Sequence, residues 1–198
     1  MKLNQFEKSV VGHPFRFWVQ NYIEMPLLKS LFDNVPLDTG MALEIGCGYG
    51  NGIRLIREHF HPEYITAIDY DFDMVHAAKS RYIDDVRVAA TQADATLLPF
   101  PDNQFDLVFN FAVFHHIPKW QKAIEEVHRV LKPNGFLLIE DLYRTAITNP
   151  LSNSMFEHPQ HNRFDHQELI AQLNMNGFRV QKEKNLLNLA GIALAQKV

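Results

Sequence analysis

The chain has 198 residues, of which 46% are hydrophobic, 12% aromatic and 21% charged. This is the composition of one ordinary globular domain, and it excludes a disordered, collagen-like or coiled-coil protein. The 19 Lys and Arg residues against 23 Asp and Glu residues give a formal net charge of −4, so the chain lacks the global positive field that binds a nucleic-acid backbone.

Cysteine content and hydropathy indicate the cellular compartment of the protein. Cys47 is the one cysteine, so an intrachain disulfide and a zinc site of four cysteines are excluded. Residues 1–10 lack a continuous apolar stretch, and no apolar run reaches the roughly 18 residues needed to span a bilayer. We therefore predict a cytoplasmic protein without a transmembrane segment.

Residues 1–40 form an aromatic-rich extension, which we predict to be a helical cap of the same domain as residues 41–198. Its prolines at 14, 26 and 36 predict a series of short helices. Phe17, Trp18 and Tyr22 are candidates for contact with a substrate. The aromatic segment 13–32 has three interpretations: a lid over the site, packing onto the sheet edge, or a membrane contact, for which its basic face is thin.

Apolar stretches of strand length then alternate with helical spacing, which predicts an α/β fold with a parallel sheet. The predicted strands, buried on both faces, are 41–46, 64–69, 86–92, 105–110 and 135–141. Apolar residues three and four apart predict the buried helix faces Ile53, Ile56 and Phe60; Met74, Ala78 and Tyr82; and Trp120, Ile124, Val127 and Leu131.

The later helix boundaries also have local signals. Asp71 is a predicted N-cap, and Asp165 with Glu168 predicts a capping box for a helix that ends at Asn176 and Gly177. Residues 178–198 predict two further strands in antiparallel pairing.

The most informative stretch is ALEIGCGYGNG at 42–52, in which Gly46, Gly48 and Gly50 join a buried strand to an amphipathic helix. Glycines at such a junction allow the backbone to approach a ligand closely. The dinucleotide fingerprint requires a third glycine where Asn51 or Ile53 stands, so an NAD-dependent dehydrogenase is disfavoured. The phosphate-binding loop with Gly-Lys-Ser/Thr is absent as well.

With these motifs in order, the sequence resembles the class I S-adenosylmethionine (SAM) dependent methyltransferases, within them the type-11 group that includes the ubiquinone and menaquinone C-methyltransferases. The segments ALEIGCGYG, AIDYD, QADATLLPFPDNQFDLVF, FHHIPKW and VLKPNGFLLIED are similar to the family's successive motifs over residues 40–142. The resemblance implies a single-domain Rossmann-like fold, with a seven-stranded, mostly parallel sheet, an antiparallel last strand and helices on both faces.

Asp69, which ends the second predicted strand, is placed to accept hydrogen bonds from both ribose hydroxyls of SAM, with a simple helix cap as the alternative. The resemblance implies that Asp94 receives the adenine amino group beside the backbone of Ala95. Tyr70 and Met74 would supply apolar contact to the adenine faces.

The methionine tail of SAM would lie across Gly46 and Gly48, near the carbonyl of Asn110. Glu44 is expected to orient the loop, and Cys47 to present its backbone rather than a reactive thiol. The full predicted cofactor set is Glu44, Gly46, Cys47, Gly48, Gly50, Asp69, Tyr70, Met74, Asp94, Ala95 and Asn110.

The acceptor side is less defined. The segment NFAVFHH lacks the Asn/Asp-Pro-Pro-aromatic clamp of enzymes that methylate nitrogens of nucleic acids and proteins. His115 and His116 follow the fourth predicted strand, where either is a candidate general base or a residue that shapes the pocket. After the fifth predicted strand, Glu140, Asp141 and Tyr143 are substrate-side candidates.

His158, His161 and His166 suggest a metal site, but neither cysteine partners nor a helical H-x3-H spacing accompanies them, so no metal is predicted. The sequence predicts a SAM-dependent methyltransferase that releases S-adenosyl-L-homocysteine. We expect a small apolar or aromatic acceptor, quinone-like or lipid-like, and no nucleic-acid partner. The alternative is a catalytically silent SAM-binding regulatory or partner subunit.

Overall fold

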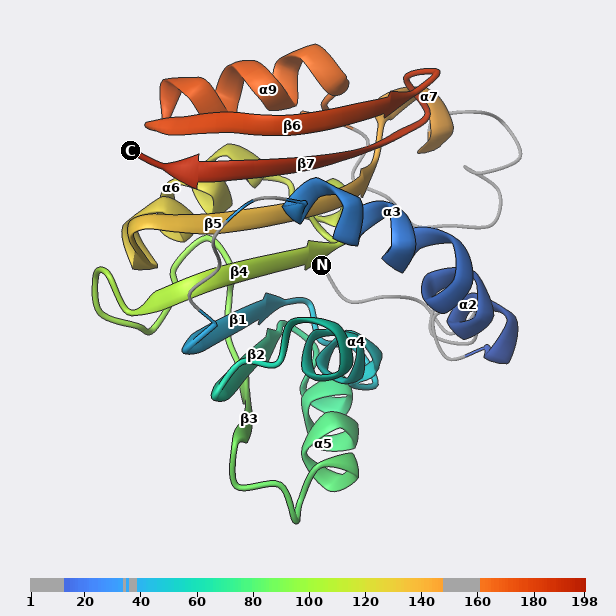
Figure 1. The fold of residues 1–198 in the computed structure, drawn as a ribbon, viewed down its shortest axis with the longest axis vertical. Helices are drawn as coiled ribbons and strands as arrows, with labels where there is room; N and C mark the ends of the chain where they lie inside the picture. Colours follow the sequence, from blue (N-terminus) through green and yellow to red (C-terminus); the bar gives the residue numbers. More distant parts are fainter. Residues whose placement is uncertain (1–12, 34, 36–38, 148–160) are drawn as a thin grey trace.

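The computed structural model describes residues 13–33, 35, 39–147 and 161–198. These residues contain a seven-stranded sheet with strand order β3-β2-β1-β4-β5-β7-β6 (Figure 1). Strands β1 to β5 run parallel, and β7 runs antiparallel to β5 and β6. The predicted Rossmann-like fold class is confirmed.

The strands are β1 (Met41–Ile45), β2 (Tyr64–Asp69), β3 (Val88–Gln92), β4 (Phe105–Phe111), β5 (Leu131–Leu142), β6 (Phe178–Leu186) and β7 (Ala190–Lys197). The helices are α2 (Pro14–Val19), the π-helix η1 (Gln20–Glu24), α3 (Met25–Lys29), the 3-10 helix η2 (Ser30–Phe32), α4 (Asn51–Phe60), α5 (Phe72–Arg81), the 3-10 helix η3 (Phe114–His116), α6 (Trp120–Val130), α7 (Arg144–Ile147) and α9 (His166–Met175).

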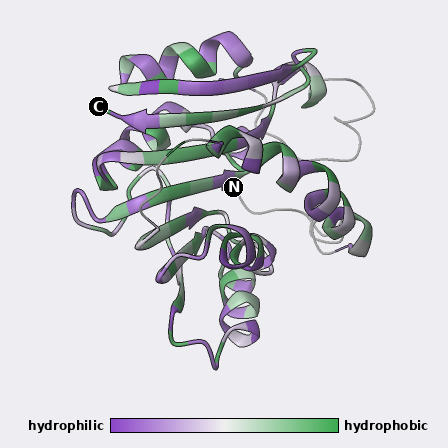
Figure 2. Cartoon of the chain, viewed as in Figure 1, coloured by the Kyte–Doolittle hydropathy of each residue, from purple (hydrophilic) through white to green (hydrophobic). Residues whose placement is uncertain are grey.

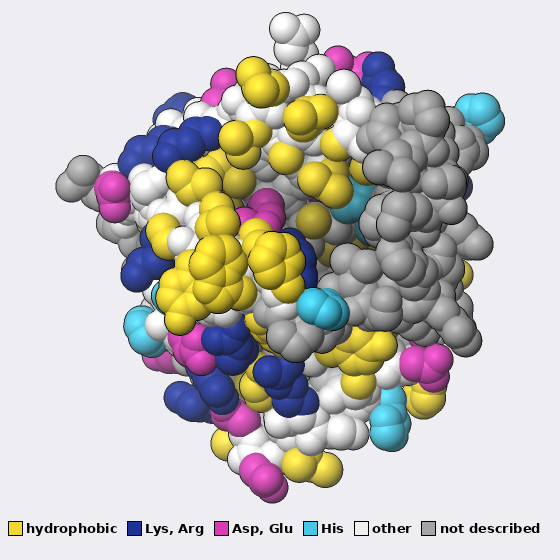
Figure 3. Space-filling view, turned by 90° about the vertical axis from the view of Figure 1, so that its right-hand side faces the viewer, with side chains coloured by type: hydrophobic (Ala, Val, Ile, Leu, Met, Phe, Trp, Pro, Cys, Tyr) yellow, Lys and Arg dark blue, Asp and Glu magenta, His cyan; other side chains and the backbone are white. Residues whose placement is uncertain are grey.

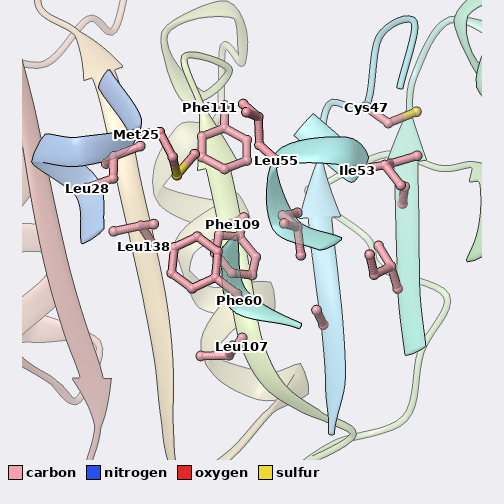
Figure 4. Close-up of a cluster of buried hydrophobic side chains, with 14 of the residues drawn as sticks. Met25, Leu28, Cys47, Ile53, Leu55, Phe60, Leu107, Phe109, Phe111 and Leu138 are labelled. Atoms are coloured by element: carbon pink, nitrogen blue, oxygen red, sulfur yellow. The ribbon is translucent and has the colours of Figure 1, made fainter. Parts of the chain in front are cut away.

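One face of the sheet is covered by α3, η2, α4 and α5. Phe109 of β4 packs against Phe60 of α4, with ring centroids 4.8 Å apart. Figure 4 shows Met25 and Leu28 of α3 on this face, next to Leu138 of β5. The N-terminal helical segment is therefore anchored in the hydrophobic core.

The other face is covered by α6 and α9, which bury Trp120, Ile124, Leu169 and Leu173. Figure 2 shows apolar central strands and a largely hydrophilic β6 at the sheet edge. Burial on both faces is therefore confined to the middle of the sheet.

The prolines of the extension act differently from the prediction. Pro14 begins α2, but Pro26 stands near the start of α3, inside an unbroken helical path from 14 to 32. The π-helical turn at 20–24 widens the backbone just before Pro26, whose nitrogen has no hydrogen to donate. The prediction that Pro26 breaks the segment is wrong, and Pro36 lies outside the described residues.

Two predicted boundaries also shift. The third strand begins at Val88 rather than 86, because Asp85 accepts a hydrogen bond from the Arg87 backbone and Val86 is left 93% exposed. As the edge strand, β3 is only partly buried. Leu131, expected on a helix face, is instead the first residue of β5.

The capping predictions are confirmed. Asp71 accepts a hydrogen bond from the backbone nitrogen of Asp73 at 3.0 Å and caps α5. Asp165 and Glu168 form a complete capping box at the start of α9, and Gly177 follows that helix with a φ of +78°.

Candidate active site

The carboxyl ends of β1, β2 and β4 open onto a cavity of about 470 Å³. This is the point where the strand order reverses direction, and in open α/β sheets ligands bind in the crevice at such a point. The lining is Ile45, Gly46, Gly48, Ile68, Asp69, Tyr70, Asp71, Ala93, Asp94, Ala95, Thr96, Phe111, Ala112, Val113, His116, Ile117, Pro118 and Lys119.

The glycine loop forms one wall of this cavity. Gly46 has a φ of +74°, and a Cβ atom there would lie 2.4 Å from Cγ2 of Val113. Its backbone nitrogen and that of Cys47 both donate to the carbonyl of Ile68 at 2.8 Å. Glycine is therefore required at 46 both by backbone conformation and by close contact with the turn after β4.

Asp69 also lines the cavity and is hydrogen-bonded to the glycine loop. Its Oδ2 accepts a hydrogen bond from Gly48 and its Oδ1 accepts one from Asp71, both at 2.9 Å from the backbone nitrogen. Burial raises the pKa of Asp69, and these two N–H donors oppose the shift. Each carboxylate oxygen has a further lone pair, so Asp69 can hold the loop and still accept bonds from a ligand.

Glu44 lies beneath the loop and does not line the cavity. A Cβ atom on Gly52 would lie 1.8 Å from its Oε1, and the Ile53 backbone hydrogen-bonds to its carboxyl. Burial raises its pKa well above the usual value, and the negative charge of Asp69 adds to this shift. Its geometry suits a residue that orients the start of α4 rather than one that touches a cofactor.

Tyr70, Asp94 and Ala95 line the cavity next to Asp69. The Oδ1 of Asp94 accepts hydrogen bonds from the backbone nitrogen and the hydroxyl of Thr96, both at 2.8 Å. Both bonds go to one oxygen, so Oδ2 is the atom better placed to meet a ligand.

Four other members of the predicted cofactor set, Cys47, Gly50, Met74 and Asn110, do not line the cavity. Cys47 is buried, and burial raises the pKa of its thiol, which disfavours the reactive thiolate. Met74 is 1% exposed and does not line the cavity, so its predicted adenine contact is not supported. Gly50 caps α4 with a φ of +81°, and Asn110 is fully buried.

The two histidines after β4 have different environments. His116 lines the cavity, whereas His115 is buried, with its Nδ1 2.5 Å from Oδ1 of Asp141. Asp141 is 1% exposed and does not line the cavity. Of these residues, only His116 is placed to meet an acceptor in the cavity.

Glu140 belongs to a cluster that the sequence did not predict. Arg16 of α2 bonds to Glu24 at 2.5 Å and lies 3.7 Å from the carboxylate of Glu140. Burial raises the pKa of Glu140 well above its usual value, and the nearby charge of Glu24 adds to this. This cluster joins the N-terminal helices to the carboxyl end of β5.

Tyr143 is 1% exposed and points into the core, where its hydroxyl is 2.8 Å from Nδ1 of His166. Its predicted contact with substrate is not supported, because it does not line the cavity. His158 lies outside the described residues. In the described part of the chain, no three His, Cys, Asp or Glu residues are grouped to hold a metal ion.

The three aromatic candidates of the N-terminal segment lie outside the cavity lining. Phe17 is half-buried, with the guanidinium groups of Arg54 and Arg81 each 5.8 Å from its ring centroid. Trp18 and Tyr22 are 51% and 69% exposed, and their rings are 5.7 Å apart. Figure 3 shows apolar side chains gathered beside a hollow with acidic side chains at its bottom.

Much of the wall after β4 was not predicted from the sequence, including Ala112, Val113 and Lys119. Ala112 has a φ of +57°, which nothing in the residue type indicates. The available signal was position, because residues at the carboxyl end of a central strand lie at the ligand crevice.

Within the described ranges, no helix is both long and apolar enough to cross a membrane.

The family model described as "Methyltransferase domain" matches residues 43–139. The chain is 32% identical over 121 residues to the fatty-acid O-methyltransferase of Mycolicibacterium smegmatis, a match that covers 61% of this chain and 44% of that protein. It is also 32% identical over 123 residues to the mitochondrial arginine-hydroxylase NDUFAF5 of Rattus norvegicus, covering 62% and 34%. The chain thus spans less than half the length of these curated relatives.

Among solved structures, a SAM-dependent methyltransferase from Mesorhizobium loti aligns with a TM-score of 0.73 at 17% identity, covering 90% of this chain and all of the other. This likeness supports the fold. The match over residues 43–139, just under half of the chain, and the motifs within it place this part of the chain in the type-11 methyltransferase domain family of the class I SAM-dependent methyltransferases.

Proposed function

We propose that the chain is an enzyme that transfers a methyl group from SAM to a small apolar or aromatic acceptor, quinone-like or lipid-like. The observation that carries this proposal is the meeting of Gly46, Gly48 and Asp69 at one cavity, in the order that the family's motifs imply. The cavity volume of about 470 Å³ falls within the range of roughly 300–1,000 Å³ typical of small-molecule sites.

The lining fits the chemical parts of SAM. Asp69 would accept from the ribose hydroxyls, and Asp94 would accept from the adenine amino group while Ile68 and Ala95 meet its faces. The absence of a side chain at Gly46 leaves room for the methionine tail close to the backbone. When bound, SAM supplies an electrophilic methyl group on a sulfonium and leaves as S-adenosyl-L-homocysteine.

His116 is our candidate to take a proton from the acceptor, because its ring lines the cavity on the side of the turn after β4. Positioning of the acceptor is the larger contribution that we expect, since proximity and orientation can supply about 7–11 kcal/mol of a barrier. The N-terminal helices, anchored through Met25 and Leu28, would act as the cap that covers the acceptor.

The acceptor class rests on two supports. The apolar residues Phe111, Val113 and Ile117 line the same cavity as His116, and one relative carries the name fatty-acid O-methyltransferase. An apolar molecule that bears a hydroxyl, phenol or carboxylate would place its nucleophilic oxygen near His116 and its apolar body on this surface.

The direct test measures S-adenosyl-L-homocysteine release during incubation with SAM and a panel of fatty acids, phenols and reduced quinones. We expect turnover with at least one acceptor, and a loss of rate without loss of SAM binding in His116→Ala. Matched loss of binding and rate would instead assign His116 to cofactor binding.

One relative is named a hydroxylase rather than a methyltransferase, and this observation supports a second candidate function. In that case the chain binds SAM without transferring its methyl group, as a regulatory or partner subunit. Tight SAM binding in calorimetry with no turnover across the whole panel would favour this second function. Binding of NADH with no binding of SAM would contradict both.

A further inference from the structure

Asp141 is the most heavily hydrogen-bonded carboxylate beside the cavity, although it does not face it. Its Oδ1 accepts from Nδ1 of His115 at 2.5 Å and from the backbone nitrogen of Leu142 at 2.8 Å. Its Oδ2 accepts from Nδ2 of Asn110 at 2.8 Å and from the backbone nitrogen of Phe114 at 2.9 Å. The side chain is fully buried, so both oxygens are satisfied inside the protein.

These bonds fix the turn after β4 to the end of β5. Three of the four donors, in Asn110, Phe114 and Leu142, are N–H groups that can only donate. The carboxylate acts as acceptor for these three, and we assign the tautomer of His115 in which Nδ1 is the donor to Oδ1.

The same turn supplies two parts of the cavity wall. Val113 is the residue that would collide with a Cβ atom on Gly46. Its position therefore sets how closely the turn after β4 approaches the glycine loop. His116 follows directly after His115, and the two rings have centroids 4.0 Å apart. Movement of His115 would therefore shift both the cofactor wall and the candidate base.

We propose that Asp141, acting through His115, is the positioning residue of the site: it holds the turn 112–116 so that Val113 closes on Gly46 and His116 faces the acceptor. This role deepens the proposed methyltransferase function and rests on it. Charged hydrogen bonds of this kind are strong in a buried environment, and misplacement of a reacting group by about 1 Å can cost about 100-fold in rate.

Asp106 provides a matched control. It is also buried, accepts from the Met41 backbone nitrogen at 2.8 Å and pairs with Lys132, but it lies near the start of β4, at the end of the strand opposite to the cavity. Asp106→Asn tests what the loss of a buried, bonded carboxylate does to the protein without a change at the cavity.

The experiment compares Asp141→Asn with Asp106→Asn by calorimetry with S-adenosyl-L-homocysteine, by steady-state kinetics and by the midpoint of urea unfolding. Asparagine at 141 would present an NH₂ group to N–H donors. We expect it to weaken ligand affinity about tenfold and lower kcat by about 100-fold, with little change in the KM of the acceptor. Asp106→Asn should lower the urea midpoint and leave affinity and kcat within twofold, because its partners lie far from the cavity.

Histidine 115 gives a second, independent readout. In His115→Asn the amide nitrogen can replace Nδ1 as a donor to Asp141, so this variant should retain most of the activity that His115→Ala loses. At saturating SAM, the double variant Asp141→Asn/His116→Ala should have a kcat no lower than that of His116→Ala alone, because both changes remove the same positioned base, while its ligand affinity should fall as in Asp141→Asn.

Asp141→Asn with unchanged affinity and kcat, or equal losses in Asp106→Asn, would overturn the proposal. If Asp141→Asn does not fold, equal activities of His115→Asn and His115→Ala would overturn it. If the wild-type protein neither binds nor turns over SAM, the proposed function fails; the positioning role is then judged by the ring resonances of His116 in NMR, which must shift in the Asp141 variant and not in the Asp106 variant.

Discussion

The carboxyl edge of the sheet has two halves that are built by different means. In the half that we propose binds the cofactor (the cofactor half), made by β1, β2 and the loop 46–50, backbone groups set the geometry: Gly46 has a left-handed conformation, and Asp69 holds two backbone nitrogens. In the half that we propose faces the acceptor (the acceptor half), made by β4, β5 and the helices of 14–32, side chains of distant segments set it, as the buried Asp141 and the partly buried Arg16 do. The first kind of geometry tolerates few residue types, whereas the second can be rebuilt for another acceptor.

The largest effect that we expect in the cofactor half comes from Gly46→Ala. The left-handed conformation costs a non-glycine residue roughly 1–2 kcal/mol, and the collision with Val113 adds about 1–3 kcal/mol of overpacking. Urea unfolding should show a loss of about 2–5 kcal/mol in the free energy of unfolding, and calorimetry a strong loss of ligand affinity.

The control for this prediction is the double variant Gly46→Ala/Val113→Ala, which removes the collision and keeps the backbone strain. It should recover part of the lost stability. A single variant as stable as the wild-type protein would show that the loop 46–50 is set by something other than its glycine.

The difference between the halves also explains which features could be predicted from the sequence and which could not. The carboxyl ends of the first five strands, the Asp71 cap and the capping box of Asp165 are local patterns, and the structure contains them with the strand ends within one residue. Tyr143 was misassigned because its burial depends on Gly191, 48 positions away, where any Cβ atom would meet its hydroxyl. The contact of Arg16 with Glu140 joins segments with no shared local signal.

The same limit applies inside the cavity. Gly46, Gly48, Asp69 and Asp94 were predicted from motif order and lie together. Val113 was not, because its role follows from the unusual backbone of the turn after β4 rather than from its residue type.

Asp69→Ala tests the cofactor half with a smaller effect. Loss of charged hydrogen bonds to the ribose should weaken the affinity for SAM by about 1–3 kcal/mol. Asp73→Ala is the matched control, because Asp73 is an exposed acidic residue in the first turn of α5 and does not line the cavity. Equal affinities of wild type and Asp69→Ala in calorimetry would show that this carboxylate is not the ribose ligand.

Each half contains a glutamate whose pKa is raised by its removal from solvent: Glu44, which is buried, and Glu140, whose side chain is 14% exposed. Because the pKa is raised, the glutamate carboxyl in the folded protein stays protonated at pH values where the same group in the unfolded chain has lost its proton. The stabilisation is therefore full below the unfolded value of about 4.3 and is lost as the pH rises through the folded pKa. Over this window the free energy of unfolding should fall by up to about 1.4 kcal/mol per pH unit for each such group.

Glu44→Gln and Glu140→Gln should each flatten this fall in urea unfolding measured from pH 4 upward. Only Glu140→Gln should also increase hydrogen exchange in the helices of 14–32, because Glu140 is the partner of Arg16 on the sheet. If both variants loosened these helices, the two halves would not be independent. If neither did, the contact of Glu140 with Arg16 would not hold the helices in place.

The smallest effect that we expect is at Trp18, on the exposed face of the helices of 14–32. Trp18 is 51% exposed, so Trp18→Ser should change the free energy of unfolding by less than about 0.5 kcal/mol. If the cap contacts the acceptor through this face, the acceptor KM should rise about threefold to tenfold, which corresponds to roughly 0.7–1.4 kcal/mol of lost apolar contact. Tyr64→Ser is the control, because Tyr64 is 53% exposed at the start of β2, at the opposite edge of the sheet. A rise in KM for Trp18→Ser alone would assign this exposed face of the helices of 14–32 to acceptor binding. Equal KM values in both variants would restrict acceptor binding to the cavity wall after β4 and the buried face of these helices.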